Sequence, residues 1–176
     1  AATGRPALVV EVSLAFCRES ARAAYDPCAP SVQERIDGIH ALHAAGIPLV
    51  LRIDPLFPRS PLPGAPAASL ADYGLPEAQT LEDLEQLLIL ARQVDAVCVV
   101  YSALKITRSR GGMNPLMRAM LDMYRRCVAP LRPVFRSGSW RLPPEVADAL
   151  IVRPFLHLAK RMGVRAEFCM QHLVKT

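Results

Sequence analysis

The sequence predicts an α/β fold, with a mostly parallel sheet of about four strands joined by helical crossovers. Two observations predict it. Apolar runs of strand length alternate along the chain with segments of helical period. The clearest helical segment, residues 32–45, follows a serine cap and ends at a glycine, so its limits are set by local chemistry. Strands separated by helices pair in parallel through right-handed connections.

The first third of the chain shows this alternation in order. Residues 8–15 are rich in Val and Leu and predict a mostly buried strand, and residues 17–24 predict a short helix. Ser31, with a glutamate three residues later, forms a capping box at the start of the next helix. Gly46 ends that helix, and residues 49–53 form the next predicted strand.

The middle of the chain contains an irregular segment followed by a second helix–strand pair. Residues 56–79 hold many prolines and form a Pro-rich loop, since proline disrupts regular helices and central strands. A loop of this length in a compact domain is usually functional or disordered. Thr80 caps the second helix, and residues 96–102 form a continuous apolar strand, typical of one covered on both faces.

The last part of the chain completes the pattern, and we interpret residues 1–176 as a single α/β domain. A basic loop over residues 105–112 precedes a predicted helix over 114–128. An unassigned stretch over 134–141 follows, and then come a helix over 143–163 and a strand over 164–170. Pro154 kinks or splits the last of these helices. Four strands are too few for a closed eight-stranded barrel, so the sheet is either open or part of a larger barrel.

Composition and charge limit the function classes. The formal charge of +5 is the sum of an acidic part, residues 1–103 with 7 Arg and 12 Asp or Glu, and a basic part, residues 104–176 with 14 Lys or Arg and 4 Asp or Glu. The basic part either attracts phosphates or an acidic partner, or is a solvated basic face. The five cysteines form no CxxC pair, which argues against an autonomous zinc or iron–sulfur site and predicts a reducing, cytoplasmic location. No apolar run approaches the roughly 20 residues that a membrane helix needs.

Polar side chains gather where the predicted strands end, which is where parallel α/β proteins bind ligands. The candidate cofactor-binding residues are Ser13, Arg52, Asp54, Tyr101 and Ser102. A hydroxyl, an Arg–Asp pair and a tyrosine suit a polar small molecule with a ribose and a carboxylate. The alternative is that the arginine and the aspartate form a structural ion pair. The candidate residues for an anionic substrate are Lys105, Arg108 and Arg110.

Three segments carry a resemblance to a known family: VEVSLA, APSVQERIDGIHALHAAGIPLVLRIDP and CVVYSALKI. In these segments the chain resembles the radical S-adenosylmethionine superfamily and, more narrowly, the spore photoproduct lyase and DNA-repair-photolyase-like group. The matching positions are Ser13, Pro30-Ser31, Arg35-Ile36, Ala45-Gly46-Ile47-Pro48 and Pro55. The match covers roughly residues 7–104.

The resemblance implies a partial (β/α)6 barrel, of which this chain supplies strands four to six and a C-terminal extension. It implies S-adenosylmethionine at the strand ends, with Ser13 at the position that touches the ribose, and radical chemistry begun at a [4Fe–4S] cluster. Arg52 and Asp54 depart from the small residues that the family usually places against the adenine. The three-cysteine cluster motif is absent from this sequence. We therefore expect this chain to ligate no cluster and to be inactive alone.

These implications define the expected partners and the competing hypothesis. The chain would be the C-terminal part of a longer protein, and it would meet an N-terminal half, or a second copy of itself, through the open edge of its sheet. Nucleic acid is the possible substrate of such an enzyme. The alternative is a non-catalytic α/β module that binds an anionic ligand, nucleic acid or a protein partner.

Overall fold

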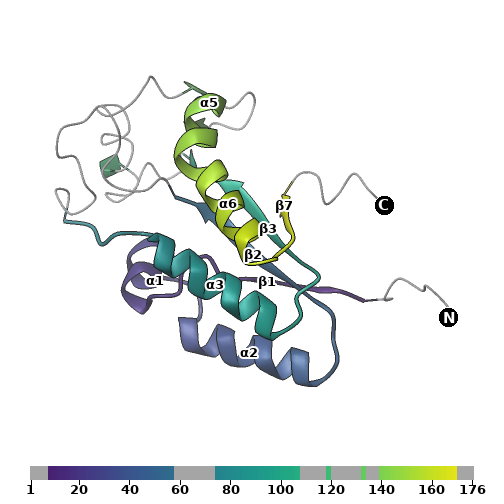
Figure 1. The fold of residues 1–176 in the computed structure, drawn as a ribbon. Helices are drawn as coiled ribbons and strands as arrows, with labels where there is room; N and C mark the ends of the chain where they lie inside the picture. The colour runs from purple at the N-terminus through teal and green to yellow at the C-terminus, as the bar shows by residue number, and fades with distance from the viewer. Residues whose placement is uncertain (1–7, 58–73, 108–117, 120–131, 134–138, 170–176) are drawn as a thin grey trace.

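A four-stranded, all-parallel sheet is the main element of the computed structural model, which describes residues 8–57, 74–107, 118–119, 132–133 and 139–169 (Figure 1). The strands lie in the order β1-β2-β3-β7. They are β1 (Val10–Ser13), β2 (Leu49–Leu56), β3 (Cys98–Ala103) and β7 (Ala166–Phe168). The predicted α/β class and parallel sheet are therefore confirmed.

The helices pack on one side of this sheet. They are α1 (Glu19–Tyr25), α2 (Val32–Ala44), α3 (Leu81–Gln93), α5 (Pro144–Ala147), the π-helix η2 (Asp148–Val152) and α6 (Arg153–Arg161). Figure 1 shows α2, α3 and α6 in front of the strands and α1 at their left end. The strand order follows the chain order, so each crossover connection leads to the neighbouring strand in the same direction. Because such connections are right-handed, their helices lie on the same side of the sheet.

Alternation along β2 divides the sheet into two faces. Leu49, Leu51 and Ile53 belong to the main core that the helices cover. Val50 belongs to a small second cluster, with Cys98 and Val100, on the opposite side of the sheet. Among the described residues, no helix contributes to this second cluster. The sheet therefore has a helix-covered face and a second face formed by strand residues.

Local chemistry explains where α2 and α3 begin. The Ser31 hydroxyl accepts from the Glu34 backbone N–H at 3.2 Å, and the Glu34 carboxylate accepts from the Ser31 N–H at 2.8 Å. Thr80 and Asp83 make the same reciprocal pair, at 3.1 and 2.8 Å. Each box satisfies two backbone donors that a helix start leaves open. Gly46, at φ +70°, follows α2 in the left-handed conformation that glycine adopts readily.

The C-terminal helix is divided as the sequence predicts. A π-turn over Asp148–Val152 joins α5 to α6, and the Arg153 N–H donates to the Asp148 carbonyl, five residues earlier. Pro154, at the start of α6, has no N–H to donate. The backbone stays helical from Pro144 to Arg161, so the π-turn lies within one continuous helical segment, directly before the residue that lacks a donor.

A second, smaller sheet differs from expectation. β4 (Lys105–Thr107), β5 (Arg132–Pro133) and β6 (Ser139–Arg141) pair antiparallel in the order β4-β6-β5. The start of the predicted basic loop is therefore a strand. β6, the partner of β4, lies more than thirty residues away in the chain, so no local sequence pattern predicts the pairing. Residues 58–73 of the Pro-rich loop and most of the helix predicted over 114–128 lie outside the described residues.

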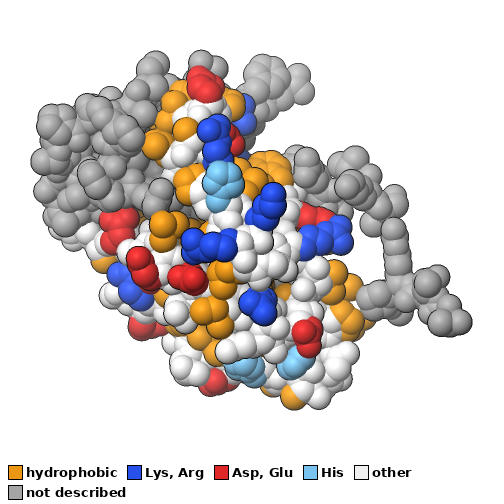
Figure 2. All heavy atoms as spheres, in the orientation of Figure 1, with side chains coloured by type: hydrophobic (Ala, Val, Ile, Leu, Met, Phe, Trp, Pro, Cys, Tyr) orange, Lys and Arg blue, Asp and Glu red, His pale blue; other side chains and the backbone are white. Residues whose placement is uncertain are grey.

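The helix-covered side carries charges of both signs. Basic side chains follow α6, and acidic side chains mark the beginning of α3 (Figure 2). Arg161 and Glu85 connect the two helices, with 3.7 Å between their charged atoms. None of the helices in the described ranges has the length and apolar character that crossing a membrane requires.

Candidate functional site

Arg52 is the centre of a polar network on the second face of the sheet. Its guanidinium donates to Glu11 on β1 at 2.5 Å and to Asp54 on β2 at 2.7 and 3.1 Å. It also donates to the Cys169 sulfur, just after β7, at 2.8 Å. The Ser102 hydroxyl on β3 donates to the other oxygen of Asp54. One network therefore connects β1, β2 and β3 with the residue that follows β7.

The network keeps Arg52 charged. Its hydrogen bonds to Glu11, and then to Asp54, raise the pKa of the guanidinium further above its already high ordinary value. An arginine held by two carboxylates has a fixed position, since each hydrogen bond restrains the planar fork. Of the two interpretations of Arg52 and Asp54, the structure shows the ion pair, and both side chains are half-buried at the sheet surface.

Beneath these charges lies the small apolar cluster of Val50, Cys98 and Val100, all less than 3% exposed. In register, Glu11 lies opposite Val50, and Glu167 lies opposite Val100. Burial raises the pKa of the Cys98 thiol, and nearby Glu167 acts in the same direction. The long charged side chains thus stand over apolar ones, and the second face presents polar groups outward.

A hollow of about 500 Å³ opens where β1 and β2 end. Its lining residues are Ser13, Ala15, Phe16, Tyr25, Asp26, Arg35, Asp54, Pro55, Phe57, Leu104 and Lys105. We call it the strand-end hollow. It lies at the carboxyl ends of parallel strands, the position where open α/β sheets bind ligands. It falls within the usual volume range of small-molecule sites, about 300–1,000 Å³.

One wall of the strand-end hollow is aromatic. The rings of Phe16 and Tyr25 stack with 5.8 Å between centroids and 19° between planes, and Phe57 contacts both at 5.6 and 5.1 Å. The Tyr25 hydroxyl donates to the Pro76 carbonyl at 2.7 Å. Burial, foremost, raises the pKa of Tyr25 to about 12, so the phenol stays protonated near neutral pH. Phe16 and Phe57 are only 5% and 6% exposed, so the half-buried ring of Tyr25 supplies most of the apolar surface that this wall offers to a planar group.

The opposite side of the strand-end hollow is polar. The Ser13 side chain is exposed, and its carbonyl accepts from the Arg35 guanidinium of α2 at 2.8 Å. Arg35 also pairs with Asp26 at 3.5 Å. Lys105 is exposed, and it also lines a neighbouring hollow of about 270 Å³ that contains Arg52, Ser102 and Cys169. The two hollows share Asp54, so the network and the strand-end hollow meet at one carboxylate.

The shape of this rim depends on Gln79, which is 1% exposed. Its amide nitrogen donates to the carbonyls of Ala15 at 2.7 Å and Pro55 at 3.0 Å. Its amide oxygen accepts from the Phe57 N–H at 2.9 Å. The segments that follow β1 and end β2 are thus tied to the start of α3. Sequence reasoning missed this residue, since one glutamine in a Pro-rich segment gives no signal.

The structure brings together four of the five predicted cofactor-binding residues. They are Ser13, Arg52, Asp54 and Ser102, and Lys105 from the predicted anion-binding group lies beside them. The other two members of that group, Arg108 and Arg110, lie outside the described residues. The aromatic wall was not predicted, although all three rings lie close after predicted strands or a helix.

Tyr101 does not join this group, which corrects the prediction that it shares an edge with Ser13 and Asp54. It lies on the helix-covered face, 6% exposed, with its ring 5.3 Å from that of Phe155 and 5.7 Å from that of Phe168. Alternation is the reason, because adjacent strand residues point to opposite faces and Ser102 occupies the polar one. Burial raises the pKa of Tyr101, as expected for a core phenol.

Comparison of the chain with protein-family models, curated proteins and solved structures gives no match. The functional interpretation therefore depends on the residues of the site and on the resemblance described above. Within the described ranges, no group of three or more His, Cys, Asp or Glu side chains could hold a metal ion. We assign no described residue to a metal or to an iron–sulfur cluster.

Proposed function

We propose that this chain is the cofactor- and substrate-binding portion of a radical S-adenosylmethionine enzyme, and that S-adenosylmethionine binds in the strand-end hollow. One observation carries the proposal. The hollow combines an aromatic wall with a hydroxyl, a carboxylate and an ammonium at the carboxyl ends of parallel strands. These are the groups that an adenine, a ribose and an amino acid would need.

The sheet topology supports this proposal at the level of architecture. In a (β/α) barrel, successive strands are neighbours, helices cover the outside, and polar ligand-binding groups occupy the strand ends. The strand order β1-β2-β3-β7 with helices on one side has this form. The second face, with its Arg52 network, would then correspond to the inside of a partial barrel.

Each part of the cofactor has a matching group in the strand-end hollow. The ring of Tyr25, with Phe16 stacked on it, would pack against the adenine. Ser13 and Asp54 would hydrogen-bond the ribose hydroxyls. Lys105 would pair with the carboxylate of the methionine part. S-adenosylmethionine supplies radical chemistry when it is bound beside an iron–sulfur cluster; the role of this chain is to bind and orient it.

Calorimetric titration with S-adenosylmethionine tests the proposal. We expect saturable binding by the chain, and at least about tenfold weaker binding by Asp54→Ala, because the variant loses a carboxylate that lines the hollow. Asp37→Ala is the matched control, since Asp37 is an exposed aspartate of α2 outside the hollow. Circular dichroism verifies that both variants fold. No saturable heat, or equal affinity for the two variants, would refute the proposal.

A non-catalytic module for an anionic ligand is the second candidate, and Lys105 is the observation that favours it. Its side chain is exposed at the point where the hollows meet. Within the described part of the chain, no carboxylate pairs with it. Inorganic phosphate in place of S-adenosylmethionine distinguishes the two candidates. Saturable heat with phosphate alone, lost in Lys105→Ala, would favour the module.

A further inference from the structure

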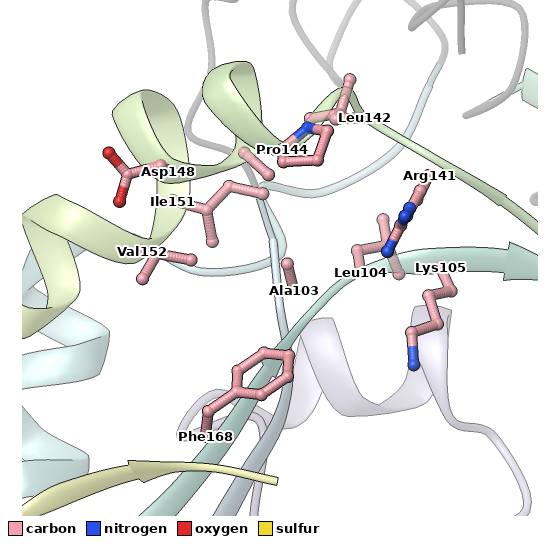
Figure 3. Close-up of a pocket in the computed structure, with 11 residues that line it drawn as sticks. Ala103, Leu104, Lys105, Arg141, Leu142, Pro144, Asp148, Ile151, Val152 and Phe168 are labelled. Carbon is pink, nitrogen blue, oxygen red and sulfur yellow. The ribbon is translucent and has the colours of Figure 1, made fainter. Parts of the chain in front are cut away.

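A third hollow, of about 190 Å³, lies beside the strand-end rim, between the end of β3, the β4–β6 pair and the helical segment that follows it (Figure 3). We call it the apolar hollow. Its apolar lining residues are Ala103, Leu104, Leu142, Pro144, Ala147, Ile151, Val152 and Phe168. Its polar lining residues are Lys105, Arg141 and Asp148. The function proposed above uses only Lys105 from this set.

Two cations stand together at the border of the apolar hollow. Lys105 on β4 and Arg141 on β6 are direct register partners in an antiparallel pair, and both side chains are exposed. Directly opposite residues of such a pair extend to the same side, within a few ångströms of each other. Figure 3 shows the two side chains next to each other, across the hollow from Ile151 and Val152.

This cation pair lacks a counter-ion within the described part of the chain. No carboxylate there lies within ion-pair distance of Lys105 or Arg141. Like charges directly opposite each other destabilise a strand pair, so an anion between them would be favourable. In backbone register, Arg132 of β5 lies opposite Arg141 on its other side. The second sheet thus places basic residues in one row across three strands.

The acidic residue at the apolar hollow does not supply the missing charge. Asp148 accepts from the guanidinium of Arg153, which forms an ion pair with it. In Figure 3 the carboxylate of Asp148 points away from the two cations. The border of the hollow near Lys105 and Arg141 is therefore positively charged, whereas its interior is apolar.

The π-turn η2 forms the wall opposite the cations. Three of its residues line the hollow, namely Asp148, Ile151 and Val152. A π-turn is rare, and such turns are frequently found at functional sites, although Pro154 also favours one at this position. Here the π-turn joins α5 to α6. A regular α-helix over the same residues would present a different set of side chains to the apolar hollow. The unusual backbone and the cation pair are independent observations at one hollow.

We propose that the apolar hollow binds a small amphipathic organic anion. An aryl or alkyl body packs against Ile151, Val152 and Phe168, and a single acidic group lies between Lys105 and Arg141. The volume is below the usual 300–1,000 Å³ of drug-sized sites, so the ligand is about the size of one ring with a short acidic arm. The evidence for this site does not rest on S-adenosylmethionine binding, since Arg141 and the π-turn line the apolar hollow and neither of the other two hollows.

Three probes test the chemistry of the ligand: 4-phenylbutyrate, 4-phenylbutan-1-ol and butyrate, each titrated into the full chain by calorimetry. We expect saturable binding of phenylbutyrate. We expect at least tenfold weaker binding of the alcohol, which lacks the charge, and of butyrate, which lacks the ring. Phenyl phosphate serves as a fourth probe that distinguishes a phosphate from a carboxylate head group, since arginine recognises both.

Variants locate the site. Arg141→Ala should weaken phenylbutyrate binding at least tenfold. Lys160→Ala is the matched control, because it removes the same charge from the exposed surface of α6, and it should leave binding unchanged. Ala147→Leu should abolish binding by filling the hollow without changing the charge. Asp54→Ala, on the other hollows, should not affect it.

Four outcomes would overturn the inference. The first is that neither phenylbutyrate nor phenyl phosphate binds. The second is equal affinity for the acid and the alcohol, because the cations would then have no role. The third is full binding by Ala147→Leu, and the fourth is an equal loss in Lys160→Ala and Arg141→Ala. None of these outcomes depends on whether S-adenosylmethionine binds.

Discussion

Gln79 fixes the backbone at the candidate site, although it touches no candidate ligand group. Among the described residues, its side chain makes three hydrogen bonds to main-chain atoms of separate segments, those of Ala15, Pro55 and Phe57. A buried amide that is fully hydrogen-bonded costs little, but removal of the amide leaves its partners buried and unpaired. One side chain therefore holds the ends of two strands against the start of a helix.

Replacement of this amide should be costly. Gln79→Leu keeps most of the volume but leaves the Phe57 N–H and two carbonyls without this partner, so the free energy of unfolding should fall by about 3 kcal/mol. Urea unfolding measures the change. Gln86→Leu, on the exposed side of α3, is the matched control, with an expected change within about 0.5 kcal/mol. Equal losses in the two variants would contradict the assignment.

At the scale of one residue, the alternation of side chains along a strand decides which of the predicted site residues reach the rim. Ser13 and Asp54 follow apolar strand residues and do reach the rim. Tyr101 and Ser102 are adjacent, so only one of them can face it, and the tyrosine goes to the core. The sequence does not indicate Gln79 or Cys169 as partners, because their contacts join residues 22 to 117 positions apart.

At the start of α3, the carboxylate of Asp83 both caps the helix and binds two other side chains. Asp83 caps the helix through the Thr80 N–H, and it also accepts from Arg18 at 2.9 Å and from the Cys17 thiol at 3.0 Å. Burial alone would raise the pKa of Asp83, but the hydrogen bonds from Arg18 and Cys17 outweigh it, and the pKa is lowered. Burial and the same carboxylate raise the pKa of Cys17 to about 12.

This carboxylate should make stability depend on pH in the acid range. A lowered folded-state pKa means that Asp83 stabilises the fold above its unfolded value of about 3.9, and that this contribution is lost as pH falls through the folded value. Asp83→Asn should cost about 2 kcal/mol at neutral pH and progressively less below about pH 4. Urea unfolding across this range measures both quantities.

The neighbouring residue supplies the control for this prediction. Glu82→Gln removes one charge from the same helix turn at an exposed position, and it should change the free energy of unfolding by less than about 0.5 kcal/mol. If the difference between Asp83→Asn and the parent chain stays constant down to about pH 2, the carboxylate does not carry the contribution assigned to it.

Elements with local signals are the ones that the sequence predicts well. Both capping boxes, the glycine end of α2 and the division at Pro154 follow from residues within a few positions of each other. The strands β4 and β6 are three residues long and exist because they pair across a long chain separation. No periodicity can develop over three residues, so that pairing has no local signature.

At the scale of the molecule, β1 is an edge strand of the parallel sheet. Among the strands that the structure describes, it pairs with β2 alone, with the Val10 N–H donating to the Pro48 carbonyl and the Leu14 N–H donating to the Arg52 carbonyl. By alternation, the N–H groups of Glu11 and Ser13 face the other way. Exposed Leu8 and Val9 precede the strand, at 63% and 41% exposure. An unpaired edge with apolar neighbours is a template for another strand.

We therefore expect the chain to associate with a second copy of itself through this edge. Analytical ultracentrifugation of the chain should show dimers that increase with concentration. Val9→Lys should weaken the association at least tenfold, since a charge at an edge opposes strand pairing. Val97→Lys is the control, because Val97 is equally exposed but lies before an inner strand. A chain that remains monomeric at high concentration would contradict this expectation.

The parallel sheet could be predicted from the order of apolar and helical segments, because helical crossovers favour parallel pairing. The position of the polar rim follows from the same topology. The hollows, by contrast, arise where α1, α2 and the π-turn bring side chains against that rim. No local sequence pattern predicts such packing between segments that are distant in the chain.

Lys105 borders all three hollows, and this has a thermodynamic consequence. One ammonium can neutralise only one acidic group fully, so occupants of adjacent hollows that both need it must compete for the same charge. Each would then reduce the affinity of the other by the same factor, because linkage between two equilibria is reciprocal. A single lysine would thus give the protein negative cooperativity between neighbouring ligands without any change of shape.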